Sequence, residues 1–185
     1  MLIGLISDTH LPEAGADLWP QVYEAFLGLK PAGPKVDLIL HAGDLHVTRV
    51  LDLLEERVGV PVIACRGNGD DGSGGRPVIP EGDPSLQANQ IIEIDGFRIG
   101  MTHTFPVPEY AYRTIEKAMQ QYFGGPVHIV VHGDTHTPDI KAYKGVLCIN
   151  SGSPMLPRNM TRSLGTVAFL QIERGRASAW IHQLE

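Results

Sequence analysis

The segment VVHGDTHTP, residues 130–138, carries three side chains that can bind a metal at alternate positions: His132, Asp134 and His136. Alternate residues of an extended chain point to the same side, so these groups could face one ion. Carboxylates and imidazoles together suit divalent cations such as Mn²⁺, Fe²⁺, Zn²⁺ and Ni²⁺. A metal site of this kind needs further ligands from elsewhere in the chain.

Similar side chains follow the other apolar segments of the chain. They stand where ligands bind in parallel α/β sheets, just beyond the carboxyl ends of the expected strands. The set consists of Asp8, His10, Asp44, Asn68, Asp70, His103, Asp134 and His136. These donors are too many for one divalent ion and suit two ions that share a carboxylate. The lack of thiolates among them argues against a structural zinc site.

The apolar segments alternate with helical patterns in the first third of the chain. Residues 2–6, 36–41 and 60–64 are expected to form buried strands, and residues 18–29 and 47–58 are expected to form the helices between them. Strands that alternate with helices predict parallel pairing. The carboxyl ends of these strands should therefore meet at one edge of a sheet.

The remainder of the chain is expected to mix hairpins with one more helix. Residues 71–89, rich in Gly, Pro and Ser, are expected to form a loop, and residues 108–123 a helix. Residues 90–95 and 97–103 read as a hairpin, because Asp95-Gly96 is a strong turn signal. Further strands, with antiparallel pairing among the last four, are expected at 127–131, 139–143, 146–150, 165–172 and 177–182.

Composition narrows the possible functions. The 185 residues, 43% hydrophobic and 19% charged, suit a single domain over residues 1–185. A net charge of −6 without a basic patch argues against strong nucleic-acid binding. No apolar run approaches the ~20 residues of a membrane span, and the start lacks the features of a signal peptide. Cys65 and Cys148 cannot form a disulfide framework, so we expect a cytoplasmic protein without membrane attachment.

The order of the motifs resembles that of the calcineurin-like metallophosphoesterases. The motifs are SDTH (7–10), HAGDL (41–45), GNGD (67–70), TH (102–103) and GDTH (133–136). The stretch NSGSPMLPR (150–158) is similar to one in the small YfcE-type phosphodiesterases, a group to which the retromer subunit Vps29 is related. The resemblance implies an α/β metallophosphoesterase fold, which is a four-layer α-β-β-α sandwich with two packed mixed sheets.

The resemblance also implies a dinuclear metal centre and assigns its ligands by position. One ion would be bound by Asp8, His10, Asp44 and His136. The other would be bound by Asp44, Asn68, His103 and Asp134, with Asp44 as the bridge. Asp70 matches a residue that steadies the turn around the asparagine.

Asp134 stands where the family has a histidine. A carboxylate can still bind a metal, and as a harder donor it favours Mn²⁺ over Ni²⁺, Zn²⁺ or Fe. It also lowers the positive charge of the centre, so we expect a weaker hold on an anionic phosphate. His132 is the alternative source of the missing imidazole, although a structural role is expected for it.

The resemblance implies hydrolysis of a small phosphodiester by a hydroxide that bridges the two ions. Larger relatives carry a histidine at the position of Gly69 that can protonate the leaving group, so its absence favours diesters or good leaving groups. His46 is expected to be a surface loop histidine, with proton donation as the alternative, and Arg66 and Arg158 are candidates for phosphate contacts.

Two other functions stay open on the sequence alone. One is a non-enzymatic protein-binding module on the same fold, as in Vps29, and the other is a phosphomonoesterase. The sequence also leaves open whether the chain forms a homo-oligomer.

Overall fold

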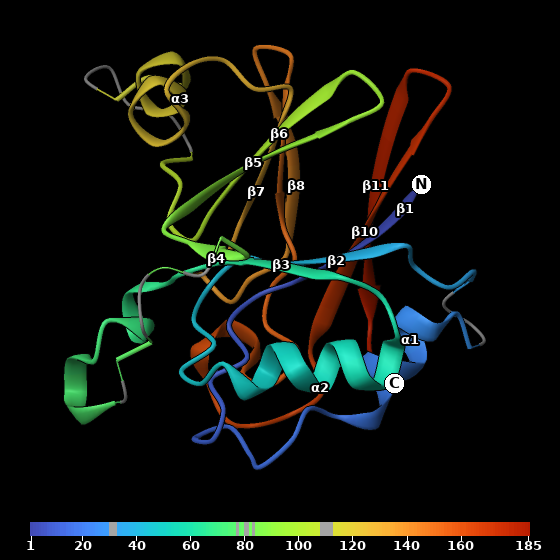
Figure 1. The fold of residues 1–185 in the computed structure, drawn as a ribbon, viewed down its shortest axis with the longest axis vertical. Coiled ribbons are helices and arrows are strands. Elements are labelled where there is room, and N and C mark those ends of the chain that lie inside the picture. Colours follow the sequence, from blue (N-terminus) through green and yellow to red (C-terminus); the bar gives the residue numbers. More distant parts are fainter. Residues whose placement is uncertain (30–32, 77, 80–81, 83, 108–112) are drawn as a thin grey trace.

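The computed structural model describes residues 1–185 except 30–32, 77, 80–81, 83 and 108–112. The described residues form two packed mixed sheets with helices on the outer faces (Figure 1). Two helices cover the first sheet, and one covers the second sheet on the opposite side of the molecule. The expected four-layer α-β-β-α sandwich is therefore confirmed.

The first sheet has the strand order β11-β10-β1-β2-β3-β4. Its strands are β1 (Leu2–Ile6), β2 (Leu38–His41), β3 (Val62–Cys65), β4 (Leu86–Gln87), β10 (Thr166–Glu173) and β11 (Arg176–Gln183). The pairs β1–β2, β2–β3 and β3–β4 are parallel, whereas β10 runs antiparallel to both β1 and β11. The expected parallel arrangement of the first three strands is confirmed, so their carboxyl ends lie at one edge.

The second sheet has the strand order β5-β6-β7-β9-β8. Its strands are β5 (Asn89–Ile94), β6 (Phe97–Thr102), β7 (Ile129–His132), β8 (Asp139–Tyr143) and β9 (Val146–Asn150). The hairpins β5–β6 and β8–β9 are antiparallel, and β7 runs parallel to both β6 and β9. The expected turn Asp95-Gly96 joins β5 to β6 with φ values of 47° and 82°, the positive values that a two-residue hairpin turn requires.

The helices are α1 (Pro20–Leu27), α2 (Arg49–Val58) and α3 (Ile115–Phe123), with short 3₁₀ turns at η1 (Asn68–Asp70), η2 (Ser73–Gly75) and η3 (Pro157–Asn159). Pro20 can begin α1 because the first helical residue needs no intrahelical hydrogen bond from its own nitrogen. Each α-helix ends at a glycine in the left-handed conformation, which a residue without Cβ adopts freely. None of the described helices is long and apolar enough to cross a bilayer.

Alternation along the strands separates three apolar clusters. In β1, Ile3 and Leu5 point between the two sheets, whereas Ile6 points toward α1 and α2. In β7, Val131 likewise faces the inter-sheet core and Val130 packs under α3. The central strands β1 and β7 are therefore buried on both faces, which specifies their pairing register within each sheet.

Several expected boundaries differ from those observed. The first two helices start two residues later than expected, at Pro20 and Arg49. Residues 71–89 are not a continuous loop: they contain η2, β4 and an isolated bridge between Asp71 and Val78. The expected helix over 108–123 is observed from Ile115, and residues 108–112 lie outside the described part of the chain.

The packing of α1 on the first sheet depends on Phe26, which is fully buried and lies against Gly4 of β1. A Cβ at Gly4 would lie 2.7 Å from the Phe26 ring, so the two residues are matched in size. We predict that Phe26→Ala lowers the free energy of unfolding by about 3–5 kcal/mol, measured by urea denaturation. Leu29→Ala, at a site 53% exposed, should change it by less than about 0.5 kcal/mol. Equal effects of the two substitutions would contradict this account.

Candidate metal centre

The loops after β1, β2, β3, β6 and β7 meet at one edge of the two sheets, and hydrogen bonds join them. The loop after β1 is bound to the loop after β2, since the backbone nitrogen of Asp8 donates to the Gly43 carbonyl at 3.0 Å. The Gly69 nitrogen, after β3, donates to Asp44 Oδ1 at 2.7 Å. In the second sheet the Gly133 nitrogen donates to the His103 carbonyl at 2.9 Å. The expectation that these strand ends converge is confirmed.

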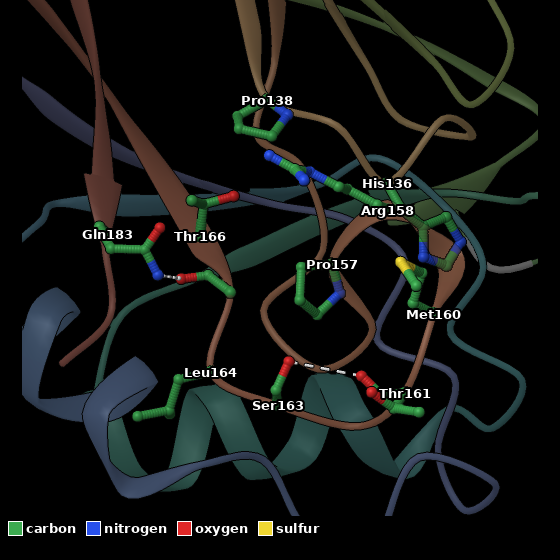
Figure 2. Close-up of a pocket in the computed structure, with 11 residues that line it drawn as sticks. His136, Pro138, Pro157, Arg158, Met160, Thr161, Ser163, Leu164, Thr166 and Gln183 are labelled. Carbon is green, nitrogen blue, oxygen red and sulfur yellow. Dashed lines mark hydrogen bonds between the residues drawn. The ribbon is translucent and has the colours of Figure 1, made fainter.

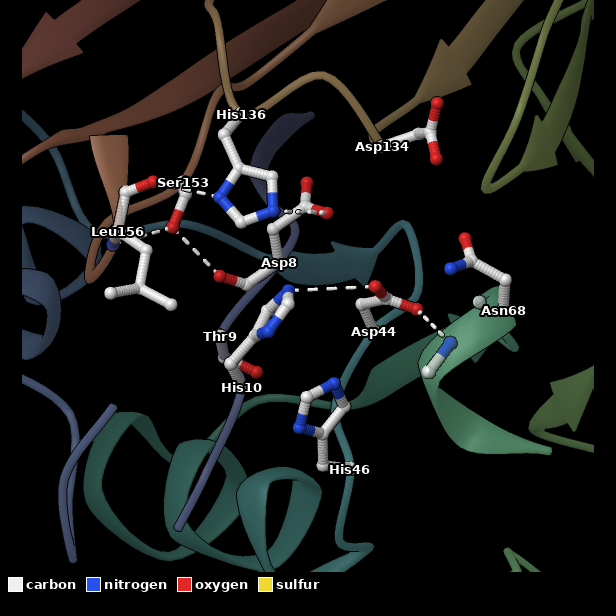
Figure 3. Close-up of polar contacts among 12 residues, drawn as sticks. Asp8, Thr9, His10, Asp44, His46, Asn68, Asp134, His136, Ser153 and Leu156 are labelled. Atoms are coloured by element: carbon white, nitrogen blue, oxygen red, sulfur yellow. Dashed lines mark hydrogen bonds and ion pairs between the residues drawn. The ribbon is translucent and has the colours of Figure 1, made fainter. Parts of the chain in front are cut away.

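Five of the expected ligands form one cluster, in which each side chain lies near a carboxylate of Asp8 or Asp44. Figure 3 shows four of them: Asp8, His10, Asp44 and His136. His136 Nε2 lies 3.4 Å from Asp8 Oδ1, and His10 Nε2 lies 3.4 Å from Asp44 Oδ2. His103 Nε2 lies 3.4 Å from Asp44 Oδ1 and 3.8 Å from Asp8 Oδ1. The two carboxylates are thus surrounded by three imidazoles that come from three different strand ends.

The buried atoms of this cluster lack ordinary partners. Both carboxylate oxygens of Asp8 and the Nε2 atoms of His10 and His103 are buried without a hydrogen bond. Burying a polar or charged group without a partner costs free energy, and native structures mostly avoid it. A divalent cation would satisfy these atoms together, because carboxylate oxygens and imidazole nitrogens are its usual ligands. The residues present therefore fit a metal centre.

Two of the imidazoles are held in the orientation that a metal ligand needs. His103 Nδ1 contacts the Ala42 carbonyl and His136 Nδ1 contacts the Leu156 carbonyl, both at 2.7 Å. Each Nδ1 can only donate to a carbonyl, so it carries the proton of the neutral ring. In the neutral ring that metal binding requires, each Nε2 would present its lone pair toward the carboxylates, as in metal sites where a second hydrogen bond orients the ring.

The pKa values show how the cluster compensates its charge without a cation. Burial raises the pKa of Asp8 to about 6, although the nearby His103 and His136 lower it in part. Burial lowers the pKa of His103, but the nearby carboxylates of Asp44 and Asp8 outweigh it and raise that pKa to about 9. Burial lowers the pKa of His10 to about 4. A proton on His103 thus provides positive charge where a metal would provide more.

The backbone that presents these groups is unusual. Asp8, His10, Asp44, Asp134 and His136 all have left-handed backbones, with φ between 49° and 73°. Residues other than glycine rarely adopt this conformation, and where they do they cluster at functional sites.

The turn that carries Asn68 is fixed on both sides. Asp70 accepts hydrogen bonds from the Gly67 nitrogen at 2.8 Å and from the His46 nitrogen at 2.7 Å, so it steadies this turn as expected. A Cβ at Gly67 would lie 1.9 Å from Asp44 Oδ1, so only glycine fits there. Figure 3 shows the Asn68 side chain on this turn, beside the Asp44 carboxylate.

Asp134 and His132, the two residues that could take the place of the missing histidine ligand, lie in different environments. Asp134 lies at the rim: its side chain is 42% exposed, and its Oδ1 is 3.8 Å from His103 Nε2. His132 is buried behind it, with Nδ1 3.5 Å from Asn150 Nδ2, and belongs to none of the metal-capable groups among the described residues. Burial lowers the pKa of His132 to about 4. Its position supports a structural role and not the replacement of a ligand.

His46 is not a surface histidine, and that expectation is wrong. It is buried, with its ring centroid 4.2 Å from that of His10. Its Nδ1 lies 2.9 Å from the carboxylate of Glu13, a residue for which no role was expected. The sequence did contain a signal for His46, since Asp44-Leu45-His46 repeats the spacing of Asp8 and His10. His41 lies beneath the site, with Nε2 3.0 Å from the Thr9 hydroxyl.

Comparison with known proteins agrees with this geometry. Residues 1–175 match the calcineurin-like phosphoesterase superfamily domain. A probable metallophosphoesterase of Methanocaldococcus jannaschii is 32% identical over 164 residues, which cover 89% of this chain and 73% of that protein. The chain belongs to the calcineurin-like phosphoesterase superfamily. Its relatives are therefore phosphoesterases that work with divalent metals.

Solved structures show the same fold at lower identity. Vps29 of Chaetomium thermophilum superposes with a TM-score of 0.72 at 17% identity, covering 100% of this chain and 86% of that one. A novel archaeal phosphodiesterase gives a TM-score of 0.60 at 20% identity and covers 98% of this chain and 100% of that one. A phosphodiesterase and a Vps29 protein are thus both among the structures that share this fold.

The unpartnered carboxylate of Asp8 should make the metal-free protein less stable at alkaline pH. A carboxyl whose pKa is raised to about 6 on folding stabilises the fold least when it is ionised, above that pH. We predict that Asp8→Asn raises the unfolding free energy of EDTA-treated protein at pH 8 by on the order of 1–3 kcal/mol. The same variant should lose affinity for Mn²⁺ in a calorimetric titration. A metal-free variant less stable than the wild type at pH 8 would contradict this prediction.

Proposed function

We propose that this chain is a phosphodiesterase that hydrolyses small phosphodiesters with two divalent metal ions, preferably Mn²⁺, and the water that they activate. The observation that supports it most is the buried cluster of carboxylate oxygens and imidazole nitrogens without hydrogen bonds. Such a cluster is costly for a protein that only binds a partner through its surface. It is useful for one that binds cations.

The geometry supports a division of the donors between two ions. One ion would be bound by Asp8, His10, Asp44 and His136. The other would be bound by Asp44, Asn68, His103 and Asp134. Asp44 is suited to the shared position, because its two oxygens face His10 on one side and His103 on the other. Two ions bound by these residues would supply positive charge for a phosphate and lower the pKa of a bound water so that it could act as the nucleophile.

The residues of the chain set the type of substrate. Position 69 is a glycine, so no side chain from that position can donate a proton to a leaving group. A diester with a good leaving group needs the least help of this kind, which is the reason for proposing diesters. His103 and His136 are oriented by backbone carbonyls and cannot rotate toward the substrate without losing those contacts.

An open cleft of about 350 Å³ begins at His136 and offers room for the substrate (Figure 2). Arg158 lines this cleft. The backbone nitrogen of Arg158 donates to the backbone carbonyl of His136 at 3.0 Å, which links the two residues. Figure 2 shows the Arg158 side chain extending from beside His136 toward Pro138. Its guanidinium group is placed to pair with an anionic group of the substrate. Arg66 lies away from this cleft and lines a separate one.

A non-enzymatic binding module is the second candidate. The structural likeness to Vps29 favours it, because the fold alone does not determine activity. The donor set of this chain favours the enzyme, since every expected ligand position carries a side chain that can bind a metal.

Hydrolysis of bis-p-nitrophenyl phosphate separates these candidates. We predict turnover with Mn²⁺ that EDTA abolishes and that His136→Ala reduces at least about 100-fold, because His136 faces the Asp8 carboxylate. His128→Gln, a substitution at an exposed histidine outside the site, should leave the rate unchanged. Lack of metal-dependent turnover would support the binding module. Faster turnover of p-nitrophenyl phosphate would instead identify a phosphomonoesterase.

Asp134 should weaken phosphate binding, because its carboxylate adds a negative charge beside the second ion position. We predict that Asp134→His lowers KM for bis-p-nitrophenyl phosphate several-fold, measured by steady-state kinetics with saturating Mn²⁺. Asp139→His, a substitution at the start of β8, serves as the control for a change of charge alone. An unchanged or higher KM for Asp134→His would refute this explanation.

A further inference from the structure

The spacing Asp-x-His occurs three times in the chain, at 8–10, 44–46 and 134–136. The first and third copies supply proposed metal ligands at both ends, whereas only the aspartate of the second copy has that role so far. In all three copies both the aspartate and the histidine have left-handed backbones, with φ between 49° and 73°. The rarity of this conformation makes a threefold coincidence a structural repeat and not a chance feature. The second copy therefore presents His46 as the others present His10 and His136.

His46 also meets the geometric needs of a ligand. Its side chain is 1% exposed, and its Nε2 is buried without a hydrogen-bond partner. One donor atom from each of His10, Asp44 and His46 lies within 4.8 Å of the other two. Figure 3 shows the ring next to His10 and below Asp44, with the nitrogen farther from the backbone directed toward them.

A carboxylate holds the other nitrogen of the ring. His46 Nδ1 lies 2.9 Å from Glu13 Oε2, and Glu13 Oε1 in turn accepts from Arg76 Nε at 3.3 Å. Since a carboxylate can only accept, Nδ1 of the neutral ring carries the proton and Nε2 keeps its lone pair. This is the carboxylate–histidine arrangement that orients metal ligands, and it matches the carbonyl contacts of His103 and His136.

The space that His46 needs is available only because position 69 is a glycine. A Cβ at Gly69 would lie 2.4 Å from His46 Nε2 and 3.1 Å from Asp44 Oδ1. A side chain at position 69 and an inward-facing His46 therefore exclude each other. Gly69 therefore leaves room for the imidazole of His46.

We propose that His46 is a further metal ligand, which binds through Nε2 to the ion shared by His10 and Asp44 and is oriented by Glu13. The site would then contain four imidazoles, from His10, His46, His103 and His136, with the carboxylate of Asp134 at the rim. The proposal rests on the metal centre of the proposed function but does not depend on which ester is cleaved.

Calorimetric titration of EDTA-treated protein with Mn²⁺, without substrate, tests the proposal. His46→Gln should weaken one of two binding events at least about tenfold and leave the other unchanged, and Glu13→Gln should weaken the same event by about 10–100-fold. His128→Gln, the same change at an exposed histidine, should bind both ions as the wild type does. Wild-type affinity of His46→Gln for both ions would overturn the proposal.

A spectrum of the wild-type protein avoids any dependence on the folding of a variant. In long-range ¹H–¹⁵N spectra of the imidazoles, Zn²⁺ should shift the Nε2 resonance of His46 together with those of His10, His103 and His136. The resonances of His128 should stay in place. If Zn²⁺ shifts the other three and leaves His46 Nε2 unchanged, His46 is not a ligand although the metal centre exists. If Zn²⁺ shifts none of these resonances, both the role of His46 as a ligand and the metal centre of the proposed function are refuted.

Discussion

The structure depends on one electrostatic constraint: the Asp8 carboxylate and the Nε2 atoms of His10, His46 and His103 are buried close together without hydrogen-bond partners. Such groups are costly in a protein interior unless a cation binds among them. The pKa of His103, raised to about 9, favours a positive charge beside Asp44 and Asp8 when no cation is bound, and no hydrogen bond reaches the Asp8 oxygens. The left-handed turns, the carbonyl-bound rings and the glycines around Asp44 are all arrangements that bring these groups together and keep them apart from solvent.

The fold can maintain this arrangement because both sheets contribute to it. The first sheet supplies the loops after β1, β2 and β3, and the second supplies those after β6 and β7. An apolar layer that includes Ile3, Leu5, Ile99 and Ile129 holds the two sheets together beneath the site. The relative positions of the donors are therefore set by close packing in a rigid core and not by flexible loops.

The departures of this chain from its family's pattern are related to one another. Asp134 places a carboxylate at the exposed rim, where the resemblance implies a histidine, and Gly69 leaves room for the imidazole of His46 at the buried end. With His46 as a ligand, as proposed, four imidazoles would face the metal centre. The negative charge at the rim lies where a phosphate must approach, so the same exchange affects the binding of substrate as well as of metal.

Features that depend on local patterns could be predicted from the amino-acid sequence: β1, the Asp95-Gly96 turn, the parallel order of the first three strands and the convergence of donors at their ends. Period-two alternation and turn chemistry are short-range signals, and parallel strands necessarily end on the same side of a sheet. The burial of His46, its contact with Glu13 and the burial of His132 beside Asn150 became known from the three-dimensional structure. These outcomes rest on contacts between residues far apart in the chain, such as Glu13 with His46 and His136 with Asp8. No local pattern encodes which side chains of such segments will meet, because packing of the two sheets determines it.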